Sequence, residues 1–135
     1  KVDTGVLTTT KGKLIASGTG PLEFKVRGAM DNNGGIVAGN GAVDLRAKSL
    51  DNRGGTVSAA GTKATRLIVT DKLDNSDGTV AAAGDTTVKA GALVNQGGAV
   101  VASGDSTLAV TVDGKLDNSA GGMLAAGGDL TLKSA

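Results

Sequence analysis

The chain contains no cysteine, histidine, tryptophan or tyrosine, and Phe24 is its only aromatic residue. The absence of cysteine excludes disulfides, thiolate metal sites and cysteine nucleophiles. The absence of histidine removes the side chain that most often serves as a catalytic acid or base at neutral pH. Without Trp or Tyr, the chain also lacks the flat side chains on which a polysaccharide-cleaving enzyme would stack sugar rings.

Long apolar runs and an excess of one charge are also missing. No apolar stretch approaches the roughly 18 residues of a membrane span. The 14 basic residues nearly balance the 13 acidic ones, and the net charge of +1 provides no long-range field to attract nucleic acid or an anionic membrane. No signal peptide opens the sequence at Lys1. We therefore expect a soluble segment excised from a longer protein, with no nucleic-acid partner and no membrane insertion.

What the chain does have is an internal repeat. A leucine-type anchor, followed in most copies by Asp-Asn, precedes a glycine-containing turn and a short Val/Ala run. The copies are Met30-Asp31-Asn32, Leu50-Asp51-Asn52, Leu73-Asp74-Asn75, Leu93-Val94-Asn95 and Leu116-Asp117-Asn118. They are separated by 20, 23, 20 and 23 residues, and Leu7 lies 23 residues before Met30. Six anchors predict six copies of one unit, and so short a unit buries its apolar face only against its neighbours.

Within each copy, apolar residues alternate with polar ones. Val43, Leu45 and Ala47, for example, alternate with the charged residues between them, a period of two that is typical of a strand. No glycine-free window shows the spacing of an amphipathic helix. The sequence therefore predicts an all-β fold, a right-handed parallel β-helix with three sides and about six coils of 20–23 residues. We expect residues 1–135 to form one such segment of a longer fibrous protein, with coils starting near residues 7, 30, 50, 73, 93 and 116.

The most specific polar feature is a column of asparagines, formed by Asn32, Asn52, Asn75, Asn95 and Asn118. Asparagine tolerates left-handed backbone in turns, and its side-chain amide can bond to the amide of the coil above or below. A ligand role would require a cavity, which the turns of a tightly wound coil do not provide. We therefore predict a structural asparagine ladder, and expect no cofactor, no metal and no catalytic residue.

Two alternatives concern the acidic residues. Asp31, Asp51, Asp74 and Asp117 form a partial column that suggests a calcium ladder, because calcium prefers oxygen ligands. However, Val94 and Thr8 replace the acid in two copies, and no calcium-binding nonapeptide recurs, so we favour turn carboxylates that accept backbone N–H bonds. A carboxylate-pair hydrolase would need acids beside a substrate groove with aromatic walls, and those walls are missing. The sequence thus favours a protein that is not an enzyme.

A third alternative concerns the basic residues. If the basic residues of the predicted strands fell along one face, their regular spacing of about 4.8 Å would suit a linear polyanion such as a glycosaminoglycan. These residues are Lys25, Arg27, Arg46, Lys48, Arg66 and Lys89. The neutral overall charge favours a plain solubilising surface instead. A carbohydrate-binding or glycosaminoglycan-binding adhesin module therefore stays open as an alternative function.

The repeated pattern resembles the repeats of filamentous haemagglutinins and of related large exoproteins of Gram-negative two-partner secretion, including contact-dependent growth inhibition stalks. The fullest copy runs from Leu50 to Gly61, and the similarity extends from about Leu7 to Ala135. The first copy departs from the pattern because residues 7–12 lack Asp-Asn. The resemblance implies a right-handed parallel β-helix that is exported through an outer-membrane transporter and displayed as a long fibre.

The repeats and the resemblance together predict a non-catalytic shaft segment of a large secreted or surface-displayed adhesin or haemagglutinin-like exoprotein. By resemblance, its expected location is outside a Gram-negative bacterium, and its task is to hold distal binding or toxic regions away from the cell. Its expected partners are the neighbouring coils of the parent fibre, the transporter during secretion, and a receptor or glycan on a host or neighbouring cell. The stalk of a contact-dependent toxin-delivery protein is an alternative within the same architecture.

Overall fold

The computed structural model describes residues 1–135 and contains fifteen β-strands and no helix. Every strand pairing is parallel. Sheet A comprises β1 (Val2–Thr4), β2 (Leu7–Thr8), β4 (Leu22–Asp31), β6 (Val43–Asp51), β8 (Thr65–Asp74), β10 (Thr86–Val94), β12 (Leu108–Val112), β13 (Leu116–Asp117) and β15 (Leu130–Ser134). Sheet B comprises β3 (Lys13–Ala16), β5 (Ile36–Gly39), β7 (Thr56–Ala59), β9 (Thr79–Ala82), β11 (Ala99–Ala102) and β14 (Met123–Ala126).

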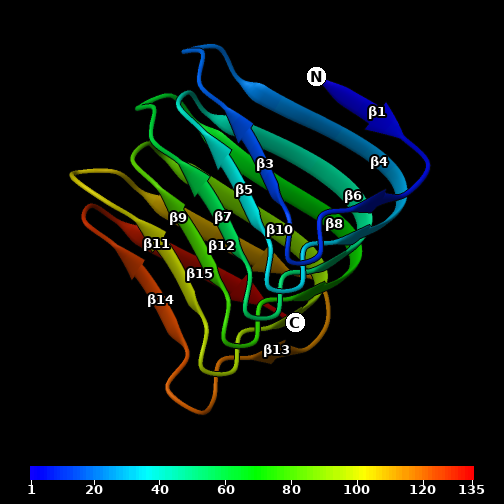
Figure 1. The fold of residues 1–135 in the computed structure, drawn as a ribbon. Coiled ribbons are helices and arrows are strands. Elements are labelled where there is room, and N and C mark those ends of the chain that lie inside the picture. Colours follow the sequence, from blue (N-terminus) through cyan, green and yellow to red (C-terminus); the bar gives the residue numbers. More distant parts are fainter.

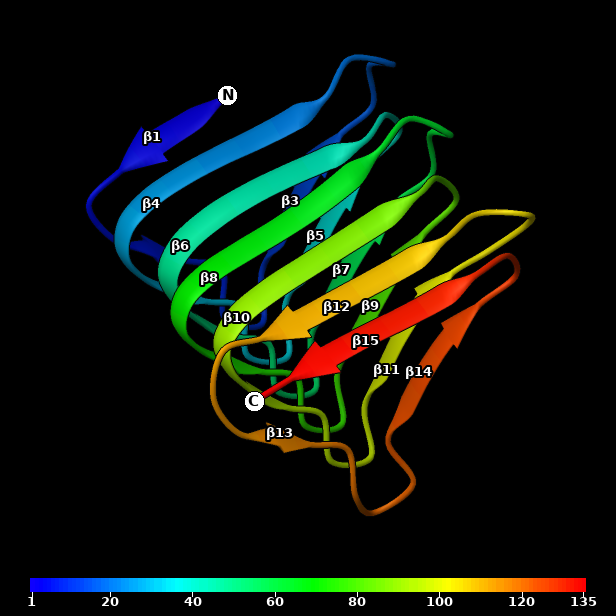
Figure 2. The same cartoon turned by 180° about the vertical axis from the view of Figure 1, so that it is seen from behind.

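The chain winds as a solenoid in which the two sheets face each other (Figures 1 and 2). In Figure 1 it runs up through sheet B at the front, returns down through sheet A behind, and advances toward the lower left from the N-terminus to the C-terminus. This winding is right-handed. The long strands of sheet A bend part-way, and the segment beyond the bend forms a third side before the turn into sheet B. The predicted right-handed parallel β-helix is therefore confirmed.

The core is a narrow stack of similar layers. The leucine-type anchors Met30, Leu50, Leu73, Leu93 and Leu116 lie in register on successive coils. Val37, Val57, Val80, Val100 and Leu124 form the matching column of sheet B. Phe24, the single aromatic residue, lies in this core and is 2% exposed. Alternating apolar side chains of both sheets meet in one cluster of 24 buried residues, so each coil buries its apolar face largely against the coils beside it.

The alternation of 20 and 23 residues has a local cause at two corners of the coil. Five residues, 17–21, connect β3 to β4, whereas three residues, 40–42, connect β5 to β6. At the bend of sheet A, three residues separate Val26 from Met30 but only two separate Ala47 from Leu50, and the register shifts there. Two extra loop residues and one extra residue in a β-bulge therefore account for the longer coils. The long loops, 17–21, 60–64 and 103–107, recur on every second coil.

No segment of the structure is a helix with the length and hydropathy needed to cross a membrane.

Candidate functional site

The five predicted asparagines come together in one continuous column. Each directly follows a strand of sheet A, namely β4, β6, β8, β10 or the short β13, at the start of the turn that leads into sheet B. From one coil to the next, the Nδ2 of each asparagine donates to the Oδ1 of the following one, and all four distances, from Asn32 to Asn118, are 2.7 Å. Asn32, Asn52, Asn75 and Asn95 are fully buried. Asn118 is exposed because no further turn within residues 1–135 stacks on it.

The buried amides are fully engaged by the protein itself. Asn75, for example, also donates to the Gly78 carbonyl in its own turn at 3.3 Å and to the Ala99 carbonyl of the next coil at 3.1 Å. A buried amide is costly unless its polar atoms are bonded, and here both the oxygen and the nitrogen have partners. The buried part of the column therefore has no free N–H group to offer a ligand. What the arrangement can do is fix each turn directly over the next.

The first coil carries a threonine where the others carry asparagine, and the sequence alone did not identify its role. Thr9 Oγ1 donates to Asn32 Oδ1 at 2.7 Å and so begins the hydrogen-bonded column. Leu7 pairs in register with Met30, and Gly12 closes the turn as the second glycine does in later copies. The position of Thr9, two residues after the anchor and three before a glycine, was the signal that could have revealed it.

The turn between the two sheets requires glycine because of crowding. A Cβ atom on Gly55 would overlap the carbonyl oxygen of Asn32 on the preceding coil and would lie 2.7 Å from the side-chain oxygen of Asn52. The preceding residue, Gly54, instead has a left-handed backbone with φ of 59° and open space around it. Asp77 takes the position of Gly54 in a later coil with φ of 54°, which shows that this position accepts a side chain. Close packing of the coils therefore requires glycine at the second position of the turn, Gly55, but not at the first, Gly54.

The acidic column forms the outer edge of the same turns. Asp31, Asp51, Asp74 and Asp117 each accept the backbone N–H of the residue two positions later, at 2.9–3.2 Å. These are the turn carboxylates predicted from the sequence. The structure holds no group of three or more acidic, histidine or cysteine side chains placed to bind a metal ion. The carboxylates are therefore engaged by their own turns.

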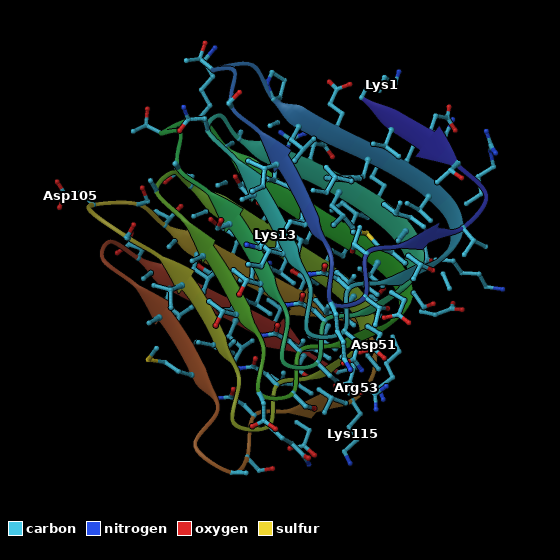
Figure 3. The ribbon with its side chains drawn as sticks, in the orientation of Figure 1. Lys1, Lys13, Asp51, Arg53, Asp105 and Lys115 are labelled. Carbon is cyan, nitrogen blue, oxygen red and sulfur yellow. The ribbon has the colours of Figure 1, made fainter.

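Neighbouring hydrogen-bond donors lower the pKa of three of these carboxyl groups. The Arg53 guanidinium, bonded to Asp51 at 2.6 Å, lowers the pKa of Asp51 (Figure 3). Partial burial raises the pKa of Asp74, but bonds from Lys72 and Ser76 outweigh it and the net pKa is lowered. Bonds from the Ser119 side chain and backbone and from Gln96 lower the pKa of Asp117. In all three groups these bonds favour the ionised form of the carboxyl group in the folded protein.

The six basic residues considered for polyanion binding all lie exposed on the outer face of sheet A. Lys25 pairs with Arg46, and Ile68 separates Arg46 from Lys89 along the same row. Arg27 is bonded to Asp3 at 2.7 Å, and Arg46 lies 3.4 Å from Asp44. Lys25, Lys48, Arg66 and Lys89 form no ion pair. We call Lys25, Arg27, Arg46 and Lys48 the basic patch; they surround a shallow depression of about 450 Å³ over Ile68 and Thr70.

Comparison with known protein families agrees with this geometry. The haemagglutinin repeat model matches residues 2–34, 18–77 and 63–135, which together span nearly the whole chain. The chain belongs to the haemagglutinin repeat family. Searches of curated proteins and of solved structures found no match.

Membership of the haemagglutinin repeat family supports a structural segment of an adhesin-like exoprotein. Proteins with these repeats are typically secreted or surface-exposed bacterial exoproteins. The repeat and the solenoid fold also indicate a structural, non-enzymatic role. In this haemagglutinin repeat chain, the most specific polar residues hold coil to coil, as a fibre segment requires.

Proposed function

We propose that this chain is a shaft segment of a fibrous exoprotein that a Gram-negative bacterium secretes or displays, and that it holds distal binding or toxic regions away from the cell. The observation that carries the proposal is the unbroken asparagine column, in which a polar side chain that recurs in five copies of the repeat bonds each coil to the next. The same geometry serves an adhesin shaft and the stalk of a contact-dependent toxin-delivery protein. Residues 1–135 form one continuous part of such a shaft in this proposal.

The stiffness expected of a shaft comes from the direction of its hydrogen bonds. The structure contains 90 backbone–backbone hydrogen bonds, and the strand pairings that hold the coils together run along the solenoid axis. Extending the fibre would therefore stretch many hydrogen bonds in parallel. Each coil interacts chiefly with its neighbours, so the stability of the solenoid is approximately a sum of similar contributions from each coil and each contact between coils. Added coils therefore lengthen the shaft by extending the existing core.

The partners of the proposed shaft follow from this role. Within the parent protein, its partners are the coils that precede and follow it. During export its partner is an outer-membrane transporter, and at the cell surface the parent meets a receptor or glycan on a host or neighbouring cell. The last two partners come from the family resemblance.

The shaft proposal can be tested by removing one 43-residue unit in register. Deleting residues 50–92 brings Leu93 into the position of Leu50 and joins two coils of the same type. We expect the shortened chain to fold and its rod to shorten by about 10 Å, twice the strand spacing of about 4.8 Å, in small-angle X-ray scattering. Deleting residues 50–70, which breaks the register, is the matched control and should prevent folding.

The functional arm uses the parent protein carrying the same in-register deletion. A shaft tolerates the loss, so secretion and cell attachment should persist. Loss of attachment by a parent that is secreted normally and still forms a β-solenoid would show that this segment contains the binding site itself, and the shaft proposal would be wrong.

The basic patch favours a second candidate function, the binding of a sulfated glycan. Four cations around one depression, spaced by the strand separation, suit a linear polyanion. The test is retention on heparin as salt is raised. If the patch binds, the Lys25→Ala/Arg46→Ala double variant should elute at lower salt, whereas Lys13→Ala on sheet B should elute with the wild type. Equal elution of all three proteins would exclude the patch.

A further inference from the structure

The outer face of sheet B is almost free of charge. Two outward positions on each of its six strands form two rows, Lys13, Ile36, Thr56, Thr79, Ala99, Met123 and Ile15, Ala38, Ser58, Ala81, Val101, Ala125. Only Lys13 among these twelve residues is charged (Figure 3). The twelve equivalent positions on sheet A include seven charged residues, namely Glu23, Lys25, Asp44, Arg46, Arg66, Lys89 and Lys133. The two faces of one solenoid therefore differ strongly in polarity.

The same face carries a projection beside a hollow. Ile15 projects from the edge of sheet B and is 63% exposed. Next to it lies a hollow of about 290 Å³, lined by Ile15 itself and by small residues that include Ala38, Ser58 and Ala60. A large apolar side chain thus lies beside a recess between small ones. This arrangement is self-complementary, because a two-fold axis brings the projection of each copy to the recess of the other.

From these observations we propose that the outer face of sheet B is a lateral docking surface for a second copy of this chain. Two such faces meet without like-charge repulsion, apart from the Lys13 residues at one edge. The outward rows repeat at the strand spacing on both copies, so their ridges match over the whole face. This inference goes beyond the shaft proposal, since a single shaft can hold distal regions without pairing with another.

The size of the face determines how strong the association is. Six strands at about 4.8 Å and four residues at about 3.3 Å each give a face of about 380 Å² on each copy. A stable interface buries about 800 Å² per partner. The isolated chain therefore pairs weakly, and the buried area grows with every coil that a longer shaft adds.

The test is sedimentation equilibrium of the chain over a concentration series that reaches the millimolar range typical of weak interfaces. Thr79→Lys places a charge in the middle of the sheet B face, and Thr87→Lys adds the same charge to the outer face of sheet A. We expect Thr79→Lys to weaken association at least tenfold and Thr87→Lys to leave it unchanged. Melting curves of both variants verify that each one is folded.

A second measurement locates the contact directly and uses the absence of cysteine. Ala81→Cys and Ala109→Cys place a single thiol on sheet B and sheet A respectively, at half-buried outward positions. With a short bis-maleimide, we expect Ala81→Cys to give covalent dimers in large excess over Ala109→Cys. The proposal is overturned if the wild type stays at 13.0 kDa throughout, if both lysine variants behave alike, or if both thiols cross-link equally. Association through the solenoid ends would give one of the last two results.

Discussion

Replacing Asn75 with alanine tests the asparagine column at its centre. The change removes the 2.7 Å bonds to Asn52 and Asn95 and the donors to two carbonyls. The Nδ2 of Asn52 keeps its two carbonyl partners, but the Oδ1 of Asn95 loses its donor while it remains fully buried. Asn118→Ala is the matched control, because that residue is exposed and ends the column.

The magnitude follows from these contacts. Two ladder bonds contribute roughly 1 kcal/mol each, and one buried acceptor without a donor costs roughly 1–3 kcal/mol. We therefore expect Asn75→Ala to lower the free energy of unfolding by about 3–5 kcal/mol. For a chain of this length that corresponds to a fall in melting temperature of roughly 10–18 °C. Asn118→Ala leaves no buried acceptor without a donor, and should cost about 1 kcal/mol or less.

The assay is thermal and urea unfolding followed by far-UV circular dichroism. If Asn75→Ala melts within about 2 °C of the wild type, or if the two alanine variants lose equal stability, the column is not stabilising in the way its geometry implies. Asn75→Asp adds a further check. Its carboxylate would face the oxygens of Asn95, Gly78 and Ala99, so burial and repulsion raise its pKa in the folded state, and lowering the pH should partly restore its stability relative to the wild type.

Three further predictions address the turn, the core and the acidic column. Gly55→Ala should destabilise the fold by more than about 2 kcal/mol because of backbone overlap, whereas Gly54→Ala should cost only about 1 kcal/mol of left-handed strain; equal losses in urea unfolding would contradict the crowding. Val57→Asp places an unpaired charge in the narrow core and should abolish cooperative melting; a soluble variant with a sharp wild-type transition would show that Val57 is not effectively buried. Folding lowers the pKa values of Asp51 and Asp74, so their ionised forms stabilise the fold above the unfolded pKa of about 4, and this stabilisation is lost as the pH falls below it. The melting temperature should therefore decrease in acid, and Asp51→Asn should reduce this decrease. A variant with the same acid profile as the wild type would count against the turn bonds.

The sequence predicted the solenoid well because stacking makes spacing directly interpretable. Residues one coil apart lie in register, so the anchor column and the Val37 to Leu124 column could be identified before the structure was known. Thr9 was missed because the prediction was based on identical residues rather than on equivalent chemistry. A hydroxyl can donate to Asn32 as an amide does, and the first coil needs only that bond.

The two features of the coil outline that the sequence did not predict depend on where the chain bends. The sequence showed that coils of 20 and 23 residues alternate. It did not show that the three extra residues are divided between a corner loop and a bulge at Val26–Met30, because that depends on strand pairing. The second feature is the flat, uncharged outer face of sheet B. The Val37 to Leu124 column indicates which residues of strands such as Thr56–Ala59 point inward, but only the closed coil shows that the remaining residues form one exposed face.

The basic patch and the sheet B face lie on opposite sides of the solenoid, and this has a consequence for any fibre built from it (Figure 2). A shaft paired through sheet B still presents the outer face of sheet A to solvent, so a polyanion meets two basic patches directed away from each other. Pairing and glycan binding are then independent: Thr79→Lys should leave heparin retention unchanged, and Lys25→Ala/Arg46→Ala should leave sedimentation unchanged. If either variant altered both properties, one surface would be serving both roles, and the separation of the two faces would not hold.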